Sequence, residues 1–555
     1  MARDLLFGLD ADQAAAVSHP SARLRVLAAP GSGKTRVLTR RAAWRVAEGT
    51  APTRLLIATF TRRAAAELEA RLRPLGVDGA AVGTFHGLAS RQLRQRADDQ
   101  RRARPRVLTD PGRALDDLEP SLRGGARLAV LGELAWAGAR RLDPAGYVVA
   151  AEEGGRRPPL GIERSAALLE RYAEWKGKRG VLDFDDLLAA WVAALLDDPE
   201  FGRAQRWRFR EVLVDEFQDV NPGQLAVVEA LLDDETRLTV VGDPDQAIYG
   251  WNGAEDALLR ELPDRLDGVD TVELGTSYRC PRPIAAAAAG VLDRPCPSTV
   301  RDGAEPELHE FTDELAERDG IVSLVSAAQA SGSDHAEIAV LARTRQLADE
   351  LAAALIGAGV AVAEGDEATG VTVTTFHAAK GLEWDDVILA GVEDGLVPHR
   401  NAVLPPQLAE ERRLLYVAMT RSGARLHVTW TAERSLRDGV VRTGASEWIG
   451  HLRGAPVPIA EAPWQVELDR CRSSLSRSMP AGARRRREAV LAWRTTVAAT
   501  ARCLPEAVVD DGTVRSLAAD PPGSIDELAA RTGWGPAALD RHGTELARAL
   551  GVPAA

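Results

Sequence analysis

The feature that most limits the fold of this chain is an apolar segment, RLRVLA, which ends at residue 28 and leads directly into APGSGKT at 29–35. A strand, a glycine-containing loop ending in Lys34 and Thr35, and a following helix make up a phosphate-binding loop. Alanine occupies position 28, where the motif usually has glycine, and the backbone N–H groups remain free to surround a phosphate. The sequence therefore predicts a nucleotide site at the carboxyl edge of a parallel sheet.

A second apolar segment, EVLVDEFQDVN at 211–221, carries Asp215 and Glu216 at its end. Two carboxylates at a strand's carboxyl edge suit metal-dependent phosphoryl transfer. We expect Lys34 to contact the β- and γ-phosphates, Thr35 and Asp215 to hold Mg²⁺, and Glu216 to polarise the attacking water. The alternative is that the acidic pair only caps a helix. The upstream phosphate-binding loop favours catalysis.

Further strand-like segments lie at 237–251, 271–280, 337–344 and 371–377 and alternate with helical stretches. Such alternation predicts an α/β protein with two parallel sheets. We expect the first sheet domain at 1–90 and 181–277, with a helical insertion at 91–180, and the second at 278–450. A linker is predicted at 451–482, where Pro, Ser and Arg are frequent.

Composition limits the class of protein. A chain of 555 residues predicts roughly three or four domains. No apolar run is long enough for a membrane span, and the N-terminus does not resemble a signal peptide, so we expect a cytoplasmic protein without a membrane partner. The four cysteines form no CxxC pair, so neither disulfides nor a zinc site are indicated, and we expect no structural metal.

The basic residues are distributed unevenly. The net charge is −12, which by itself argues against a polyanionic partner, but 91–106 and 484–487 are strongly basic. Each basic segment is either a nucleic-acid contact or a solvated helix face. Lysine is rare among the 69 basic residues. Each lysine is therefore a candidate for a site that needs a compact ammonium group, and the alternative is that lysine occurs at that position by chance. The lysines are Lys34, Lys176, Lys178 and Lys380.

A series of spaced motifs carries a family resemblance. In order they are LDADQAAAV (9–17), APGSGKT (29–35), ATFTRRAAAE (58–67), GTFHGL (83–88), LDFDDLL (182–188), VDEFQDVN (214–221), VGDPDQAIYGWNGA (241–254), SYR (277–279), FHAAKGLEW (376–384) and EERRLLYVAMTR (410–421). The chain resembles the UvrD/Rep family of superfamily I DNA helicases from residue 9 to about 449. The resemblance implies two RecA-like domains that bind ATP and Mg²⁺ between them.

The resemblance also implies roles for individual residues at the nucleotide. Gln13 would read the adenine edge, Tyr278 would stack on the base, and Glu383 would accept hydrogen bonds from the ribose. Gln246, Arg279 and Arg421 would converge on the γ-phosphate, with Arg421 as the arginine finger. The remaining residues expected to bind ATP belong to the loop and the start of its helix: Ala29, Gly31, Ser32, Gly33 and Arg36.

For the nucleic acid, the resemblance implies 3′ to 5′ movement on single-stranded DNA and action on 3′-tailed duplex. Aromatic side chains suit a sequence-independent motor because every base can stack on them. Core packing is the alternative for the aromatic and histidine residues, and Lys380 is expected near phosphate. The residues expected along the strand are Phe60, Thr84, His86, Tyr249, Trp251 and His377.

Two departures from the family pattern stand out. Asn252 occupies a position where the family usually has arginine, so a cation is missing or supplied elsewhere. The interval 345–371 is short, whereas most relatives carry a large helical regulatory subdomain there. We therefore expect that insertion to be absent near 357–371. The protein would then lack either an element that restrains unwinding or an element that grips duplex DNA.

The C-terminal segment 483–555 resembles an HRDC domain, a small all-α nucleic-acid module, and the alternative is a spacer or protein-binding bundle. We expect Arg531 and Arg541 to contact DNA. The overall prediction is a monomeric ATP-dependent helicase or translocase for DNA repair or replication restart, with a possible repair protein as partner. The alternatives are a DNA-stimulated ATPase that strips proteins or serves a partner without unwinding, and a DNA-binding protein that uses ATP only as a switch.

Overall fold

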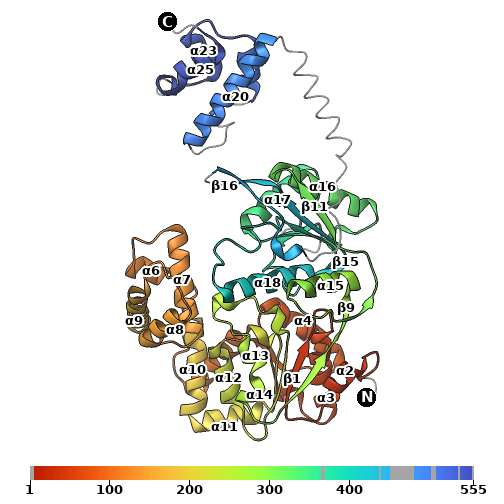
Figure 1. Cartoon of the computed structure of the whole chain (residues 1–555). Helices are drawn as coiled ribbons and strands as arrows, with labels where there is room; N and C mark the ends of the chain where they lie inside the picture. Colours follow the sequence, from red (N-terminus) through yellow and green to blue (C-terminus); the bar gives the residue numbers. More distant parts are fainter. Residues whose placement is uncertain are drawn as a thin grey trace. The chain divides into compact units, whose positions relative to one another are not determined.

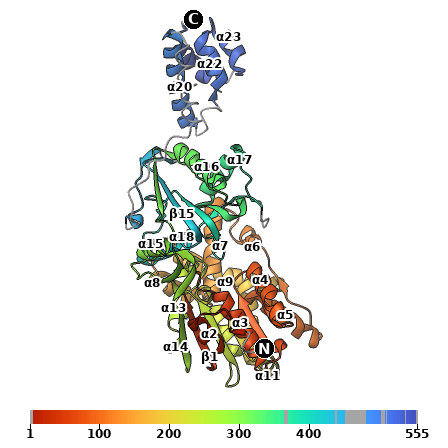
Figure 2. The same cartoon turned by 90° about the vertical axis from the view of Figure 1, so that its right-hand side faces the viewer.

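The structure is a computed structural model (Figures 1 and 2). It describes residues 5–363, 369–436, 439–450, 481–501, 508–509, 511–535 and 538–552. The chain divides into two compact units, 1–458 and 459–555, which are described separately. The first contains both sheets, and the second is helical.

The first sheet is parallel, with strand order β3-β2-β6-β7-β1-β8. Its central strands are buried on both faces, as helices on either side of a parallel sheet require. The helices α2, α3 and α4 cover one face, and α5, α10, α12 and α13 cover the other. The strands are β1 (Arg23–Ala28), β2 (Leu55–Thr59), β3 (Ala81–Thr84), β6 (Glu211–Val214), β7 (Arg237–Gly242) and β8 (Val269–Leu274). The helices are α2 (Ala11–Ser18), α3 (Lys34–Ala47), α4 (Arg62–Leu72), α5 (Phe85–Asp99), α10 (Phe184–Asp197), α11 (Pro199–Arg208), α12 (Pro222–Leu231), α13 (Ala257–Arg260) and α14 (Leu262–Arg265).

Helices α6 to α9 form a separate group beside the first sheet (Figure 1). They are α6 (Gly112–Leu118), α7 (Gly124–Ala139), α8 (Pro144–Glu153) and α9 (Ile162–Arg179), and they bury two small cores of their own. Short strands β4 (Arg106–Val107) and β5 (Val181–Leu182) pair where the chain leaves and rejoins the sheet domain. The predicted start of the insertion, residue 91, lies inside α5.

The second sheet is also parallel, with order β11-β15-β14-β12-β13. Helices α15 and α18 pack on one face, and α16 and α17 pack on the other. The strands are β11 (Glu307–Phe311), β12 (Ile338–Ala342), β13 (Thr372–Thr375), β14 (Trp384–Ala390) and β15 (Ser422–Thr431). The helices are α15 (Arg282–Val291), α16 (Glu314–Ala330), α17 (Arg345–Gly357) and α18 (Pro405–Met419). A hairpin follows, β16 (Glu433–Leu436) with β17 (Gly439–Arg442).

The strand expected at 271–280 is two strands. β8 ends at Leu274 and pairs with β1 in the first sheet, whereas β9 (Thr276–Pro281) pairs with β10 (Ser298–Arg301). The break at Gly275 is where the chain leaves the first sheet for the second domain. The predicted domain boundary at 277/278 thus falls within β9.

Helix α17 is followed closely by β13. After Gly357 the chain forms an isolated bridge between Val362 and Val371 and enters β13 at Thr372. Residues 364–368, part of the interval where the family insertion was expected to be missing, lie outside the described residues. Val362 and Val371, which flank these residues, form the bridge just before β13, the edge strand of the second sheet.

The C-terminal unit contains α20 (Ala481–Ala501), α22 (Asp511–Ala519), α23 (Ile525–Thr532) and α25 (Thr544–Leu550), which surround an apolar core. Most of the predicted linker, 451–480, lies outside the described residues. Arg531 donates hydrogen bonds to the carbonyl oxygens of Ser516 (3.0 Å) and Asp520 (2.6 Å). This guanidinium, expected at DNA, therefore caps the end of α22.

The predicted fold class is confirmed: parallel α/β sheets with a helical insertion and a helical C-terminal domain. Among the helices in the described part of the chain, none combines the length and apolar composition that crossing a bilayer requires.

Candidate nucleotide cleft and nucleic-acid interface

The loop between β1 and α3 is shaped by glycines in the left-handed region. Gly31 has φ of 70° and Gly33 has φ of 85°. A Cβ at Gly31 would lie 2.5 Å from Cβ of Arg279, and one at Gly33 would lie 2.9 Å from Nε2 of Gln13. No side chain caps the N-terminus of α3. Its N–H groups therefore face the loop as an anion-binding end.

Lys34 begins α3 and is buried below the loop. Its Nζ donates to the carbonyl oxygen of Ala28 at 3.1 Å and lies 3.9 Å from Oδ2 of Asp243. Burial lowers the pKa of Lys34, while Asp243 and Glu216 partly offset that effect. A largely buried ammonium whose ion-pair partner Asp243 is as far as 3.9 Å away is well placed to receive a further anion.

Asp215 and Glu216 follow β6, as the sequence predicts. Glu216 has φ of 52°, an uncommon left-handed conformation for a residue with a side chain. Gln218 donates to its carboxylate at 2.5 Å. Burial by itself would raise the pKa of Glu216, but Lys380, Lys34, the Gln218 hydrogen bond and Arg421 outweigh it, so that the pKa is lowered. Glu216 is therefore ionised near neutral pH.

Asp215 fits the role of a metal ligand. Its Oδ1 is buried and has no hydrogen-bond partner among the described residues. Burial, together with the neighbouring Glu216, raises the pKa of Asp215 to about 7. A divalent cation would relieve both effects, and Thr35 lines the same cleft. The residues present thus suit Mg²⁺.

Arg421 joins the second domain to this group. It lies between α18 and β15, is only 2% exposed, and donates from Nη2 to Oε1 of Gln246 at 3.2 Å. Its Nε donates to the carbonyl oxygen of Val417 at 2.8 Å, which fixes the side chain. Burial and the nearby Arg279 lower the pKa of Arg421 to about 10, so the guanidinium stays charged. Gln246 in turn donates to Asp243 at 2.6 Å.

Arg279 and Glu383 both line the cleft and form an ion pair with each other. Nε of Arg279 donates to Oε2 of Glu383 at 2.6 Å, and Nη2 lies 2.5 Å from the same oxygen. The Glu383 side chain is 65% exposed, whereas that of Arg279 is 19% exposed. The group expected at the γ-phosphate and the group expected at the ribose are therefore paired with each other.

Two of the residues expected at the base are engaged with the protein. Nε2 of Gln13 donates to the carbonyl oxygen of Ser32 at 2.8 Å, and its Oε1 accepts from the backbone N–H of Asp10. The Tyr278 hydroxyl donates to Asp10, and the Tyr278 side chain is exposed. Gln13 and Ser32 are buried behind the loop, while Tyr278 lines the cleft.

The cleft between the two sheet domains has a volume of about 1110 Å³. It brings together most of the residues predicted for nucleotide and metal. From that set, Gly31, Gly33, Lys34, Thr35, Arg36, Asp215, Glu216, Gln246, Tyr278, Arg279, Glu383 and Arg421 line it, and Gln13, Ala29 and Ser32 do not.

An aromatic row lies close to this cleft. The rings of Phe60 and Tyr249 are stacked, with centroids 5.0 Å apart and an interplanar angle of 17°. Trp251 meets Tyr249 edge-on at 6.3 Å and is 57% exposed. Phe60 and Tyr249 are half-buried. The row thus offers an exposed indole supported by two stacked rings, an arrangement suited to an unpaired base.

Of the other three residues expected at DNA, His377 alone has a hydrogen bond or ring contact with this row among the described residues. Thr84 caps α5 by accepting from the N–H of Gly87 at 3.2 Å. His86 meets Phe184 edge-on at 5.7 Å. The carbonyl oxygen of His377 accepts a long hydrogen bond from the Tyr249 hydroxyl at 3.5 Å, so His377 adjoins the row.

His377 predicts a measurable pH dependence of stability. Burial, reinforced by Arg343, lowers the pKa of His377 to about 4. Between about pH 6.5 and pH 4, His377 is therefore protonated in the unfolded chain but neutral in the folded chain. The free energy of unfolding falls as the pH drops through this range. At pH 5 the loss is about 2 kcal/mol. His377→Gln should remove that part of the loss, as measured by melting temperatures at pH 8 and pH 5. An equal loss in both proteins would contradict the assignment.

Lys380 does not line the cleft. Its Nζ lies 2.6 Å from Oδ2 of Asp219, donates to the carbonyl oxygen of Gln246 at 2.6 Å, and lies 5.0 Å from the Tyr249 ring centroid. The expectation of a phosphate contact is thus replaced by an ion pair between the two sheet domains. Lys176 is likewise buried in an ion pair, with Asp183 at 2.5 Å.

Sequence reasoning missed several supporting residues. Gln218 holds Glu216, Asp243 lies between Lys34 and Gln246, and Asp219 pairs with Lys380. All three lie inside quoted motifs, at most three residues from a predicted site residue. Their closeness in sequence to the predicted site residues could have identified them.

The chain matches three family profiles. They are the UvrD/REP helicase N-terminal domain at 9–122 and 152–266, the UvrD-like helicase C-terminal domain at 361–433, and the HRDC domain at 483–550. The HRDC match agrees with the helical C-terminal unit, and the two helicase matches fall on the two sheet domains.

Curated relatives agree with the profiles. The chain is 31% identical over 564 aligned positions to "ATP-dependent DNA helicase UvrD2" of Mycobacterium tuberculosis, covering 78% of this chain and 80% of that protein. It is 33% identical over 374 positions to "DNA helicase II" of Escherichia coli, covering 64% of this chain and 51% of the relative. The chain therefore belongs to the UvrD/Rep family of helicases and carries an HRDC domain.

Proposed function

We propose that this protein is an ATP-dependent DNA helicase that moves 3′ to 5′ along single-stranded DNA and acts in DNA repair or replication restart. The observation that carries the proposal is the meeting of Lys34, Glu216 and Gln246 from the first domain with Arg421 from the second in one cleft. The names of the relatives, which are ATP-dependent DNA helicases, support DNA as the substrate.

The residues of the cleft have separable tasks in hydrolysis. Lys34 and the N-terminus of α3 hold the phosphates, and ionised Glu216 orients a water molecule and takes up its proton. Arg421 stabilises charge that develops on the γ-phosphate. Thr35 and Asp215 would hold Mg²⁺, which when bound neutralises phosphate oxygens. Because Arg421 comes from the second domain, the site is complete only when the two domains are together.

The nucleotide cleft is joined to the aromatic row by a short path. Lys380 of the second domain donates to the carbonyl oxygen of Gln246 and lies over the ring of Tyr249, three residues further along the chain. A shift between the domains at Gln246 therefore acts directly on the rings proposed to hold the bases. This coupling is how we propose that hydrolysis moves the strand.

A second candidate function is a translocase that strips proteins from DNA, or serves a partner, without unwinding duplex. The short connection from α17 to β13 favours it. The alignment with UvrD2 supports the same point: 78% of 555 residues is about 433, so roughly 130 of the 564 positions have no counterpart here. Because a base-pair step is worth about 1.4 kcal/mol of stacking, a motor without a duplex-gripping element depends on fraying.

Single-turnover unwinding of a 3′-tailed duplex, with ATPase on single-stranded DNA measured alongside, separates these candidates. Lys34→Ala serves as the inactive control, and a 5′-tailed duplex tests direction. Unwinding only of the 3′-tailed duplex supports the helicase. Stimulated ATPase without unwinding of either duplex supports the translocase, and ATP binding without turnover contradicts both.

Trp251 provides a test of the DNA path. Trp251→Ala should raise the DNA concentration needed for half-maximal ATPase stimulation by about 5- to 150-fold, since stacking on an aromatic ring is worth about 1–3 kcal/mol per base. The matched control is Trp207→Ala, because Trp207 is also exposed but packs against Arg54 outside the row. Equal effects of the two substitutions would remove Trp251 from the DNA path.

A further inference from the structure

A compact group of metal-ligating side chains lies on the second sheet, away from the nucleotide cleft. In the part of the chain that the structure describes, Glu307, His309 and His427 are the one set of three such residues with converging donor atoms. None of them lines the cleft. The proposed motor function assigns them no task.

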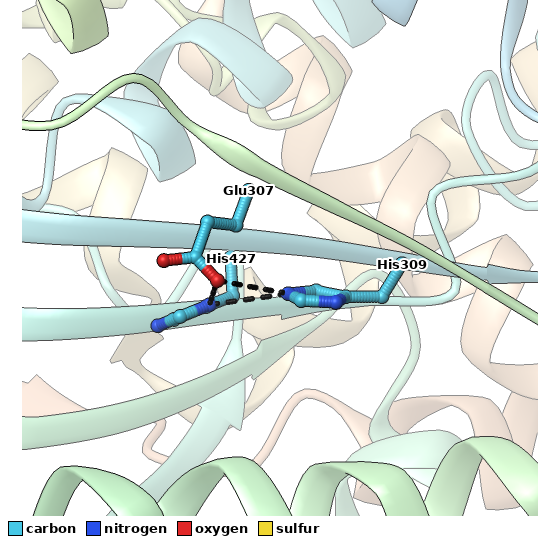
Figure 3. Close-up of side chains that lie close together, drawn as sticks. All are labelled: Glu307, His309 and His427. Atoms are coloured by element: carbon cyan, nitrogen blue, oxygen red, sulfur yellow. Dashed lines mark hydrogen bonds and ion pairs between the residues drawn. The ribbon is translucent and has the colours of Figure 1, made fainter. Parts of the chain in front are cut away.

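The strand pairing explains why these side chains meet. The edge strand β11 pairs with β15 in parallel, and Glu307 lies opposite His427 in the register. His309 follows Glu307 by two residues and thus shares its face of the sheet. The intervening Leu308 belongs to the core on the α15 and α18 side, so the group lies on the α16 side. Figure 3 shows the three side chains pointing toward one another.

The distances match a first-row transition metal. Nε2 of His309 lies 3.2 Å from Nδ1 of His427, and Oε2 of Glu307 lies 3.5 Å from that nitrogen and 3.8 Å from Nε2 of His309. A point in the plane of the three atoms is about 2.0 Å from each, which is the usual Zn–N and Zn–O bond length. In a tetrahedral zinc site neighbouring ligand atoms are about 3.3 Å apart, so the two separations that involve Glu307 would shorten by a few tenths of an ångström on binding.

The surroundings suit a metal with one open position. His309 and His427 are 2% and 9% exposed, whereas the Glu307 side chain is 47% exposed, so solvent reaches the group from the carboxylate side. Arg425 acts on Glu307 electrostatically, and its Nη2 donates to Asp386 at 2.7 Å, which offsets its charge. Two imidazoles and one carboxylate are also a recurring protein ligand set for zinc.

We propose that Glu307, His309 and His427 bind one divalent transition-metal ion of the Zn²⁺ class, which fastens the edge strand β11 to β15. This proposal differs from the sequence-based expectation of no structural metal, which rested on cysteine spacing alone. The ligands come from positions 118 residues apart, and no short motif links them. The alternative is a hydrogen-bonded histidine pair beside a carboxylate, with no metal.

The test uses the full-length protein, stripped with a chelator, desalted, and incubated with Zn²⁺. We expect one tightly held equivalent by elemental analysis and a melting temperature that rises with Zn²⁺ concentration. Glu307→Gln and His427→Gln should each weaken Zn²⁺ binding by more than the roughly 10- to 100-fold that a mere supporting partner contributes. His335→Gln, in a 3₁₀ helix elsewhere in the same domain, should keep the full equivalent.

Two further measurements separate loss of metal binding from loss of folding: ATPase activity and Co²⁺ absorption. Glu307 is partly exposed, so Glu307→Gln should fold even if a histidine variant does not, and ATPase activity reports folding of each protein. Co²⁺ in place of Zn²⁺ should give the visible absorption of a tetrahedral site in the unsubstituted protein only. Absence of a bound equivalent and of any Zn²⁺-dependent melting shift, or equal binding by Glu307→Gln, would overturn the metal site and leave the histidine pair.

Discussion

Glu216→Gln is expected to lower DNA-stimulated ATP turnover by about 10²- to 10⁴-fold while leaving ATP and DNA binding intact. Glutamine has nearly the shape of glutamate and can occupy the same buried position, but it cannot accept the proton of the attacking water. The lowered pKa of Glu216 makes the loss specific to the ionised carboxylate. Turnover measured at saturating DNA, together with binding of a fluorescent ATP analogue, checks both halves of the expectation.

The matched control for this substitution is Glu67→Gln. Glu67 also lines the cleft, but it lies on α4 and has no assigned part in hydrolysis. It should retain turnover close to that of the unsubstituted protein. Hydrolysis retained by Glu216→Gln, or lost equally in the control, would remove Glu216 from its proposed role.

Arg421→Ala should lower turnover by about 10³- to 10⁵-fold, the effect typical of a lost arginine finger. Arg421→Lys should lose most of that activity as well, because an ammonium cannot reproduce the planar fork that reaches Gln246 and the backbone of α18 together. ATP binding should persist in both variants, since Lys34 and the loop are unchanged. Single-turnover hydrolysis with pre-bound ATP measures the effect on the chemical step.

Arg412→Ala is the control for a lost arginine, because Arg412 lies on α18, the helix that Arg421 closely follows. Arg412 pairs with Asp293 at 2.7 Å near the surface and does not enter the cleft. Its removal should leave turnover unchanged, as expected for an exposed ion pair. A melting temperature for each protein distinguishes a catalytic loss from unfolding, because Arg421 is buried. Turnover within about 10-fold of normal in Arg421→Ala would contradict the finger assignment.

The parts of this molecule that local sequence determines were predictable. The loop at 29–35 and the carboxylates after β6 each follow a buried strand, and parallel pairing brings such strand ends to one edge. The two-sheet fold class followed from the same alternation. The division of 271–280 into two strands at Gly275 could not be predicted in this way, because it depends on tertiary pairing: β8 pairs with β1, whereas β9 pairs with β10.

Contacts between distant segments could not be predicted from the sequence either, because they also depend on tertiary pairing. Lys380 and Asp219 are 161 residues apart in sequence, and the choice of a carboxylate over a phosphate depends on how the domains meet. The amide of Gln13, which the resemblance places at the base, donates to the carbonyl oxygen of Ser32, 19 residues away, and its role at the base stays a prediction. The metal-ligating group on β11 and β15 depends on strand register, which composition cannot supply.

The ion pair between Arg279 and Glu383 bears on how the spent nucleotide leaves. On the proposed assignments, binding of ATP breaks this pair, because the γ-phosphate takes Arg279 while the ribose takes Glu383. ADP still offers the ribose but no longer competes for Arg279. The guanidinium can then return to the carboxylate and displace the sugar, so the pair lowers the affinity for product relative to substrate. In motors whose cycle is limited by product release, such a contact sets the time between steps.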